Sequence, residues 1–389
     1  KNLTQFTSHI LTATIVKQYT KTKLTKKGKT KTYQVLKLKA EKGFSFYTIR
    51  KKDFPDSQGK KIDIEIFSTD ISFYQYLTSF FSFSRLITIH NSKSLKYTLS
   101  KYLIEIHSDK DVSSIYKALY SATSLPKHLQ QTFSQLGISH LLAISGFHLG
   151  VLSLVLFFLL KMPYKFFQNR YFPYRSYKRD SFFIIIGILF IYMLFLDTPA
   201  SLLRAFVMLL IGFFLYDRGY KIISMMTLLL TVILIISFAP RLLFSLGFWL
   251  SVFGVFYIFL FIIHFKHLSK LWQFLLIPIW VYLMMLPVSL FIFEAFSIYH
   301  PFSIILTSLF TLFYPLSIVL HIIDFGSLLD SYLLWILNVV DNQNTVRISK
   351  EVILIFAFVS FISIWKKIFI YLLLSLSLFI FIYSIYQVT

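Results

Sequence analysis

The sequence contains no cysteine among its 389 residues. Disulfide bonds and thiolate metal sites are therefore excluded, although the lack of cysteine does not identify a cellular compartment. Acidic residues are also few, with 17 Asp and Glu against 39 Lys and Arg and a formal net charge of +22. The distribution of this charge matters more than its size, because 21 Lys and Arg against 8 Asp and Glu lie between Lys1 and Lys110.

Two short motifs lack a residue that their chemistry requires. Gly28-Lys29-Thr30 resembles the end of a phosphate-binding loop, but Lys23 occupies the position of the first required glycine, so we expect no ATP hydrolysis. His107-Ser-Asp-Lys-Asp111 lacks the paired His-x-His of a metallohydrolase site. The sequence therefore predicts no catalytic residue, no metal and no cofactor.

What the sequence does have is long apolar runs. Hydrophobic residues make up 56% of the chain, and the mean hydropathy is +0.69. This composition predicts a polytopic α-helical membrane protein of about eight to ten spans, with an N-terminal β domain outside the membrane. Segment 328–340 is too short and too amphipathic to be a span. We place the spans at about 138–160, 181–198, 199–216, 222–239, 242–263, 271–293, 301–323, 351–365 and 368–386.

Residues 1–110 alternate between apolar and polar side chains instead of forming apolar runs. Tyr33–Lys39, Gly43–Ile49 and Lys61–Phe67 show the two-residue period of half-buried strands. Several such strands in this length predict a small β-barrel of the OB type. Three aromatic residues could belong to the core of this barrel or to an exposed stacking surface. They are Phe73, Tyr74 and Tyr76.

The segment 111–137 reads as an amphipathic connector near the membrane surface, and 138–389 as the transmembrane domain. Segment 161–180 carries six Lys and Arg against one Asp, which predicts a cytoplasmic loop. Strict alternation of the spans then places residues 1–110 on the periplasmic side.

The stretch His140–Gly150, HLLAISGFHLG, stands at the start of the apolar sequence. If Leu136–Leu160 is one helix, three small residues share a packing face and two histidines lie toward a second face. One interpretation is helix packing with both histidines hydrogen-bonded to neighbouring helices, and another is the lining of a polar path. The small residues are Ala143, Gly146 and Gly150, and the histidines are His140 and His148.

A second stretch, Asp197–Met208, places Arg204 inside an apolar helix. Arginine deep in a membrane helix costs roughly 2.5–3.5 kcal/mol on insertion scales, so the residue needs a partner or a function. Arg204 could pair with Asp197, reach toward the interface, or face an anionic substrate.

A third stretch, Pro240–Gly254, contains Gly247, Ser251 and Gly254 at the spacing of a close-packing face. Further along, several prolines suggest broken or kinked helices near the outer surface. They are Pro287, Pro301 and Pro315, with Glu294 between the first two.

Three stretches resemble the hallmark motifs of the ComEC competence family, in the same order. They are HLLAISGFHLG, DTPASLLRAFVM and PRLLFSLGFWLS, and the later MLPVSLF resembles the proline-rich continuation of that family. The resemblance covers about 136–320. It implies a channel in the bacterial inner membrane that admits single-stranded DNA during natural transformation, with an OB-like domain outside.

The sequence differs from many members of that family in two respects. It ends directly after an apolar run, without the metallo-β-lactamase-like domain that many members carry, so no nuclease activity is carried over. It also begins with Lys and without a signal-peptide pattern, so we expect upstream residues that could include further spans. The resemblance implies a periplasmic DNA receptor and a cytoplasmic helicase-like motor as partners, besides single-stranded DNA and the lipid bilayer.

The resulting hypothesis is a passive DNA conduit. One alternative is a secondary transporter for a small anionic solute. Another is an intramembrane hydrolase using Ser145, although the sequence around Ser145 has no nucleophile elbow and no oxyanion site. Residues assigned to the DNA path are His140, Ser145, His148 and Arg204. Residues assigned to DNA binding on the outer domain are Lys37, Lys39, Arg50, Lys51, Lys52, Lys60 and Lys61.

Overall fold

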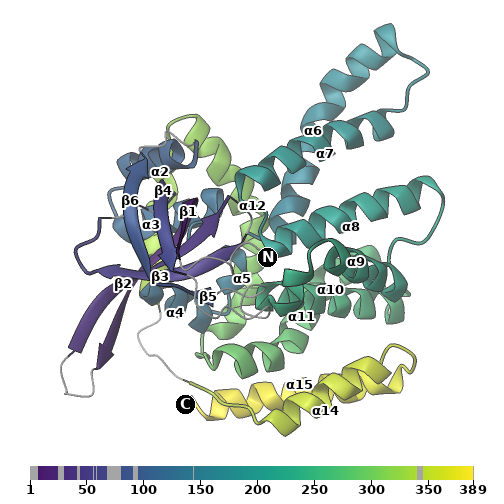
Figure 1. Ribbon diagram of the computed structural model, residues 1–389. Coiled ribbons are helices and arrows are strands. Elements are labelled where there is room, and N and C mark those ends of the chain that lie inside the picture. The colour runs from purple at the N-terminus through teal and green to yellow at the C-terminus, as the bar shows by residue number, and fades with distance from the viewer. Residues whose placement is uncertain are drawn as a thin grey trace. The chain divides into compact units, whose positions relative to one another are not determined.

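A computed structural model describes residues 8–24, 30–41, 44–55, 57, 59–67, 80–90, 95–142, 144–339 and 345–388. The chain divides into two compact units, Lys1–Pro126 and Lys127–Thr389 (Figure 1). The division falls inside segment 111–137, which the sequence suggests as a connector.

The first unit is built on a curled sheet whose described strands are connected in the order β5-β3-β2-β1-β4-β6. All neighbouring strands are antiparallel except β3 and β5, which are parallel. The three strands predicted from alternation overlap β2, β3 and β4, so the predicted N-terminal β domain is confirmed. The strands are β1 (Ser8–Leu24), β2 (Thr30–Ala40), β3 (Ser45–Lys51), β4 (Lys61–Phe67), β5 (Phe80–Phe81) and β6 (Ser84–His90).

One short stretch of chain, Phe80–His90, links the two edges of this sheet. Its first part, β5, pairs with β3, and its second part, β6, pairs with β4. Between them the Ser82 N–H donates to the Tyr47 carbonyl at 2.9 Å, and the Phe67 N–H donates to the Phe83 carbonyl at 3.1 Å. The same stretch therefore satisfies backbone groups of both edge strands.

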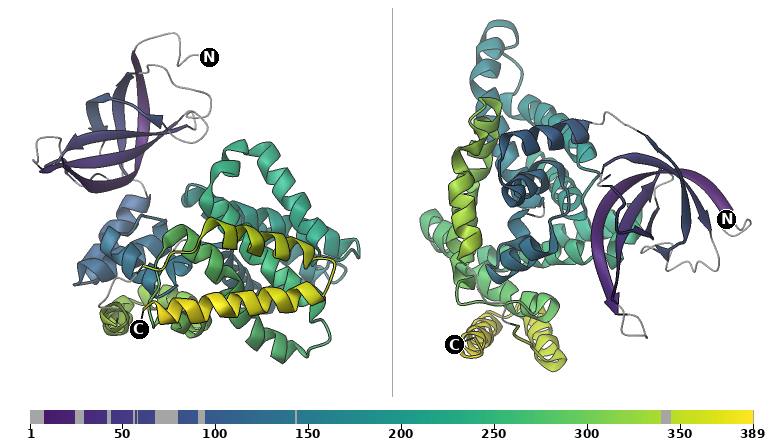
Figure 2. Two further views of the ribbon diagram at one scale, coloured as in Figure 1. Left: turned by 90° about the horizontal axis from the view of Figure 1, so that it is seen from below. Right: turned by 90° about the vertical axis from the view of Figure 1, so that its left-hand side faces the viewer.

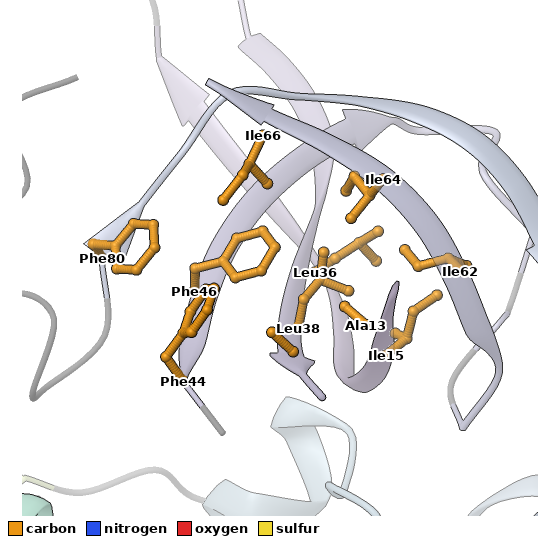
Figure 3. Close-up of a cluster of buried hydrophobic side chains, with 11 residues drawn as sticks. Ala13, Ile15, Leu36, Leu38, Phe44, Phe46, Ile62, Ile64, Ile66 and Phe80 are labelled. Carbon is orange, nitrogen blue, oxygen red and sulfur yellow. The ribbon is translucent and has the colours of Figure 1, made fainter. Parts of the chain in front are cut away.

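The concave side of the sheet holds an apolar core (Figure 3). Alternate residues of each strand point into it, as the two-residue period requires. Burying each large apolar side chain contributes roughly 1.5–3 kcal/mol, so the core stabilises the curl. Its members are Ala13, Ile15, Leu36, Leu38, Ala40, Phe44, Phe46, Ile62, Ile64, Ile66 and Phe80.

Two helices follow in the first unit, α2 (Leu95–Ile106) and α3 (Lys110–Ser121). Asp109 caps α3, because its carboxylate accepts hydrogen bonds from the N–H groups of Asp111 at 2.7 Å and Val112 at 3.0 Å. His107 is buried and stacks on the Tyr116 ring at 4.3 Å between centroids. The structure thus gives the His107–Asp111 string a packing and capping role.

The second unit is a bundle of helices. Its shorter elements are α4 (Lys127–Gln135), α5 (Ser139–Leu142), η1 (Pro240–Phe244), η2 (His300–Phe302), η3 (Gly326–Leu329) and α13 (Asp330–Asn338). Its longer helices are α6 (Gly146–Tyr171), α7 (Tyr177–Phe195), α8 (Ala200–Asp217), α9 (Met225–Phe238), α10 (Leu246–His264), α11 (Lys270–Phe293), α12 (Ser303–Ile322), α14 (Lys350–Ile362) and α15 (Ile368–Tyr386).

Six helices in the described residues are long and apolar enough to cross a membrane. They are α6, α8, α10, α11, α15 and His300–Ile322, and α9 is a shorter apolar helix of 14 residues. The chain is therefore a multi-pass helical membrane protein with an N-terminal β domain, as its composition predicts.

The prediction of a single helix over Leu136–Leu160 is wrong. α5 ends at Leu142, and α6 begins only at Gly146. Ser145 is the N-cap of α6, and its extended backbone, with φ −124° and ψ 174°, interrupts the helix. The proposed packing face of three small residues therefore does not form on one helix, and Ala143 lies outside the described residues.

Candidate functional site

The outward side of β1, β2 and β3 carries tyrosines and lysines. Because alternate residues of β2 and β3 fill the core, the residues between them point outward. Cross-strand pairing places Lys21 opposite Tyr33, and Lys37 opposite Tyr47. We call this surface the tyrosine–lysine face, and its members are Tyr19, Lys21, Lys31, Tyr33, Lys37, Lys39, Tyr47 and Lys51.

Electrostatic effects show how close these groups are. Burial raises the pKa of Tyr19, and the neighbouring Tyr47 and Tyr33 raise it further, so its hydroxyl stays neutral. The Lys37 ammonium lies over the Tyr47 ring at 5.6 Å from the centroid, a cation–π contact. Burial lowers the pKa of Lys37 from its ordinary value. The face therefore combines positive charge with flat aromatic surface.

The seven basic residues suggested by the sequence do not all lie on this face. Lys37, Lys39 and Lys51 do, and the exposed Lys52 follows directly after β3. Arg50 points to the opposite side of the sheet. Its Nη1 donates to the Ser84 carbonyl at 2.9 Å, so it links β3 to the start of β6.

The remaining two lysines of that set have other neighbours. Lys60 lies over the Tyr97 ring at 5.9 Å from the centroid, and Lys61 forms an ion pair with Glu41 at 3.0 Å. Phe73, Tyr74 and Tyr76 lie outside the described residues. Sequence reasoning missed the three tyrosines of the face, because only the register of three strands brings them together.

The outward side of β4 and β6 has a different character. Asp63 accepts hydrogen bonds from the Thr12 hydroxyl at 2.8 Å and the Thr88 hydroxyl at 2.9 Å, and it pairs with the His90 ring at 2.6 Å. These hydrogen bonds, led by that of Thr12, lower the pKa of Asp63. We call this surface the acidic–apolar face, and its members are Ile10, Asp63, Glu65, Phe67, Phe83, Thr88 and His90.

In the helical unit, Ser145 and His148 form the cap at the start of α6. The Ser145 N–H donates to His148 Nδ1 at 3.2 Å, and the Ser145 hydroxyl accepts from the Phe147 N–H at 3.3 Å. Because Nδ1 accepts a backbone N–H, the ring proton resides on Nε2. His148 is fully buried, and its ring meets the edge of the Tyr314 ring at 4.7 Å between centroids.

This arrangement lacks the parts of a serine hydrolase. His148 Nε2 has no hydrogen-bond partner within the described part of the chain, so no carboxylate orients the ring. The Nδ1 atom that faces the Ser145 hydroxyl already accepts a backbone hydrogen bond. The other histidine of the motif, His140, lies on α5 and contacts the Thr307 hydroxyl at 3.3 Å.

Arg204 is buried inside the bundle, with 4% of its surface exposed. Its Nε donates to the Ser251 hydroxyl at 2.8 Å, and its Nη1 contacts the Met208 sulfur at 2.9 Å. Among the described residues, no Asp or Glu forms an ion pair with it. An ion pair with Asp197 is therefore not formed, and a buried cation is left with neutral partners.

The small residues around Arg204 play unequal parts. A Cβ on Gly146 would lie 2.7 Å from the Ala205 Cβ and 3.1 Å from Arg204 Nη2, so glycine is needed where α6 meets α8. A Cβ on Gly150, Gly247 or Gly254 would meet nothing within 4 Å. These three positions therefore have room for a larger side chain, unlike Gly146. Ser251 serves as the hydrogen-bond acceptor of Arg204.

Further polar groups gather near the turn between α4 and α5. The His300 ring lies against Gly137, where a Cβ would stand 2.6 Å from its Cε1. His300 Nδ1 contacts the Tyr282 hydroxyl at 3.2 Å, and the Ser297 hydroxyl donates to the Gln135 carbonyl at 2.9 Å. Gly137 has a positive φ of 71°, which favours glycine. The sequence offered no signal for this cluster, because its members are far apart along the chain.

The three sequence motifs therefore meet in one part of the bundle, since α6 packs on α8 at Gly146 and Arg204 of α8 bonds to α10 at Ser251. The sequence model described as Competence protein matches residues 121–388. This chain belongs to the competence protein family. The resemblance noted in the sequence is confirmed.

Other comparisons add little to this family assignment. An Aquifex aeolicus protein described as an uncharacterized protein is 28% identical over 140 residues, which is 36% of this chain and 30% of that protein. The chain thus spans under a third of that relative. No solved structure matches the chain. Within the described residues of this competence-family chain, no cluster of three His, Cys, Asp or Glu side chains can hold a metal ion.

Proposed function

We propose that the chain is a channel in the bacterial inner membrane that carries single-stranded DNA into the cytoplasm during natural transformation. The observation that carries this proposal is the tyrosine–lysine face. Lysines neutralise phosphates whatever the sequence, and aromatic rings stack on any base. A surface with both, such as Lys37 beside Tyr47, suits arbitrary single-stranded DNA.

The strand connectivity supports an OB-like identity for the β domain. β1 pairs with both β2 and β4, and Phe80–His90 joins β3 to β4. OB folds bind oligonucleotides on the outward side of the strands that follow β1. The tyrosine–lysine face occupies this position on β2 and β3, so we assign DNA binding to it, with Lys37, Lys39 and Lys51 as phosphate contacts.

For the path through the bundle we propose His140, Ser145, His148 and Arg204. His148 and Arg204 are buried, so DNA would reach them only after the helices around them separate. A buried guanidinium without a carboxylate partner supports this role, because a passing phosphate would supply the missing negative charge. Ser145 has a capping role, so we propose a conduit and assign no catalytic step to it.

The basic loop 161–180 supports an orientation with that loop in the cytoplasm and the β domain in the periplasm. We propose a periplasmic DNA receptor and a cytoplasmic helicase-like motor as partners, since the chain carries no ATP-binding motif of its own.

The proposal is tested by following fluorescent DNA in a naturally competent host that lacks this protein. DNA should accumulate outside the inner membrane and enter the cytoplasm once the chain is restored. Equal entry with and without the chain would contradict the channel. The variant Arg204→Gln should lower transformation at least about tenfold at unchanged protein level, because a charge-assisted hydrogen bond contributes about 1.5–3 kcal/mol.

Arg218→Gln is the matched control for Arg204→Gln. Arg218 is exposed and lies at the other end of the same helix, α8. Its substitution should leave transformation unchanged. If both variants lower transformation equally, the effect does not come from the buried position.

A secondary transporter for a small anionic solute is the second candidate, and the buried Arg204 favours it. It requires uptake coupled to a counter-ion and no affinity of the full chain for oligonucleotides. Oligonucleotide binding by the lipid-reconstituted chain separates the two candidates, because only the DNA channel needs the tyrosine–lysine face.

A further inference from the structure

The helix α12 contacts the bundle at the start of α6. Along α12, Phe310 packs on both Phe147 and His148, and Tyr314 also packs on His148. Two successive turns of α12 therefore contact the first turn of α6.

The same position on α12 touches the end of another helix. The Tyr314 hydroxyl lies 3.0 Å from the Tyr192 hydroxyl, and α7 ends three residues later at Phe195. Because α6 begins where α7 ends, these contacts place the first half of α12 at one end of the bundle. We call it the Glu294 end, after the residue that follows α11 there.

Both termini of α12 lie at this end. α12 follows directly after η2, whose first residue, His300, rests against Gly137 between α4 and α5. After α12, Gly326 packs on His321, and α13 then contacts α4. In the right-hand view of Figure 2, α12 is seen from the side, with its axis in the plane of the picture, whereas α14 and α15 are seen nearly end-on. α12 therefore runs across the direction of those helices.

The chain also returns to the place from which it left. Ala295 and Thr345 form an isolated antiparallel bridge, and Arg347 pairs with Glu294 at 2.9 Å. The segment between them begins and ends at the Glu294 end. It must therefore cross the membrane an even number of times. Because both termini of α12 lie at the Glu294 end, we take this number to be zero.

Exposed apolar side chains form two stripes on this segment. Exposed residues of α12 recur at intervals of three and four, which defines one stripe of a helix. A second stripe continues along η3 and α13, with Tyr and Trp of the kind that favour the membrane–water interface. The first consists of Ile305, Leu309, Leu312, Leu316 and Val319, with Ile323 directly after the helix, and the second of Phe325, Leu328, Tyr332 and Trp335.

We propose that α12 and α13 do not cross the membrane but lie along the lipid surface at the Glu294 end, with both stripes in the acyl boundary of one leaflet. The occupant of the stripes is lipid, because α12 has the length and hydropathy of a span yet runs across the other helices. A helix in this position buries its apolar side in the interfacial region. The count of spans then excludes 301–323. This inference is independent of DNA binding.

Depth measurements in lipid test the proposal directly. The chain has no cysteine, so single cysteines at Ile305, Leu312 and Val319 can each carry one fluorophore in the full chain reconstituted in vesicles. Quenching by lipids brominated at different acyl depths reports the depth of each. We expect the three positions to share one shallow depth. A crossing helix would instead place Leu312 about 10 Å deeper than one or both of the others, and this result would overturn the proposal.

The helix α15 supplies the matched control. Leu372, Phe379 and Tyr386 have the same spacing on an exposed apolar side of a helix that is long enough to span. Fluorophores there should differ in depth, with Phe379 deepest. If α15 also gave one shallow depth, the vesicles would not hold the bundle as a multi-pass protein, and the inference from α12 would fail with it.

A charge substitution gives a second, independent measurement. Lysine at the edge of the bilayer can extend its ammonium into the headgroups, whereas lysine at the centre cannot. Leu312→Lys should therefore keep the yield of folded protein within about twofold of the unaltered chain, and Phe379→Lys should reduce it at least about tenfold. Equal losses for both variants would place Leu312 at the bilayer centre and contradict the proposal.

Discussion

The β domain presents two outward faces that share a single sheet and a single core yet differ in chemistry. On the tyrosine–lysine face, cations lie beside tyrosines, as in Lys37 opposite Tyr47. On the acidic–apolar face, Asp63 accepts three side-chain hydrogen bonds, and Phe83 stands exposed. Because both faces cover the same core, they differ in surface chemistry alone.

The largest expected effect comes from removing the aromatic part of the first face. The double variant Tyr33→Ala, Tyr47→Ala should lower the affinity of the lipid-reconstituted chain for an oligothymidine about 100-fold, since stacking contributes about 1–3 kcal/mol for each base. Fluorescence anisotropy measures the change. The matched variant Phe67→Ala, Phe83→Ala on the acidic–apolar face should bind as the unaltered chain does. Equal losses in both variants would remove the distinction between the faces.

A smaller effect is expected from single lysines. Lys37→Ala should weaken oligonucleotide binding a few-fold and reduce the slope of log K against log salt by about 0.7, the value for one phosphate contact with a single strand. The control is Lys61→Ala, because Lys61 lies outside the face and pairs with Glu41. A salt titration of both variants checks this. An unchanged slope for Lys37→Ala would show that its ammonium contacts no phosphate.

The smallest effect concerns acid stability of the acidic–apolar face. Since the pKa of Asp63 is lowered in the folded chain, its contribution to stability is present above the ordinary pKa of an aspartate. That contribution is lost as the pH falls through the lowered value. Thermal unfolding between pH 7 and pH 3 should show a small loss of Tm with acid that Asp63→Asn diminishes. An identical acid dependence in the variant would assign the loss to other groups.

Much of the fold follows from the periodicity of the sequence. The alternation in Lys61–Phe67 matches β4 residue for residue, and the last apolar run, 368–386, matches α15. The long strand β1 gave less signal, because polar residues such as Thr20–Thr22 fill both sides of its outer half. The helix break before Gly146 was missed because Ala143-Ile144-Ser145 continues the apolar run, and only Ser145 three residues before His148 hints at a cap.

The candidate sites depended more on tertiary structure. Arg204 stood out from the sequence, but its burial and its bond to Ser251 required the packing of α8 on α10. The tyrosines of the tyrosine–lysine face come from three strands, so strand register was needed to group them. Likewise, α12 has the composition of a span, and only the folded bundle shows that it runs across the direction of α14 and α15 (Figure 2).

The stretch Phe80–His90 has a consequence for how the chain is made. Synthesis proceeds from the N-terminus, so β1 to β4 leave the ribosome before the residues that pair with β3 and β4 exist. During that interval the nascent sheet has two open edges, which are templates for aggregation. The arrival of eleven residues, 80–90, seals both edges in one event. The backbone groups of β3 and β4 are thus paired before the helices of the bundle have all left the ribosome.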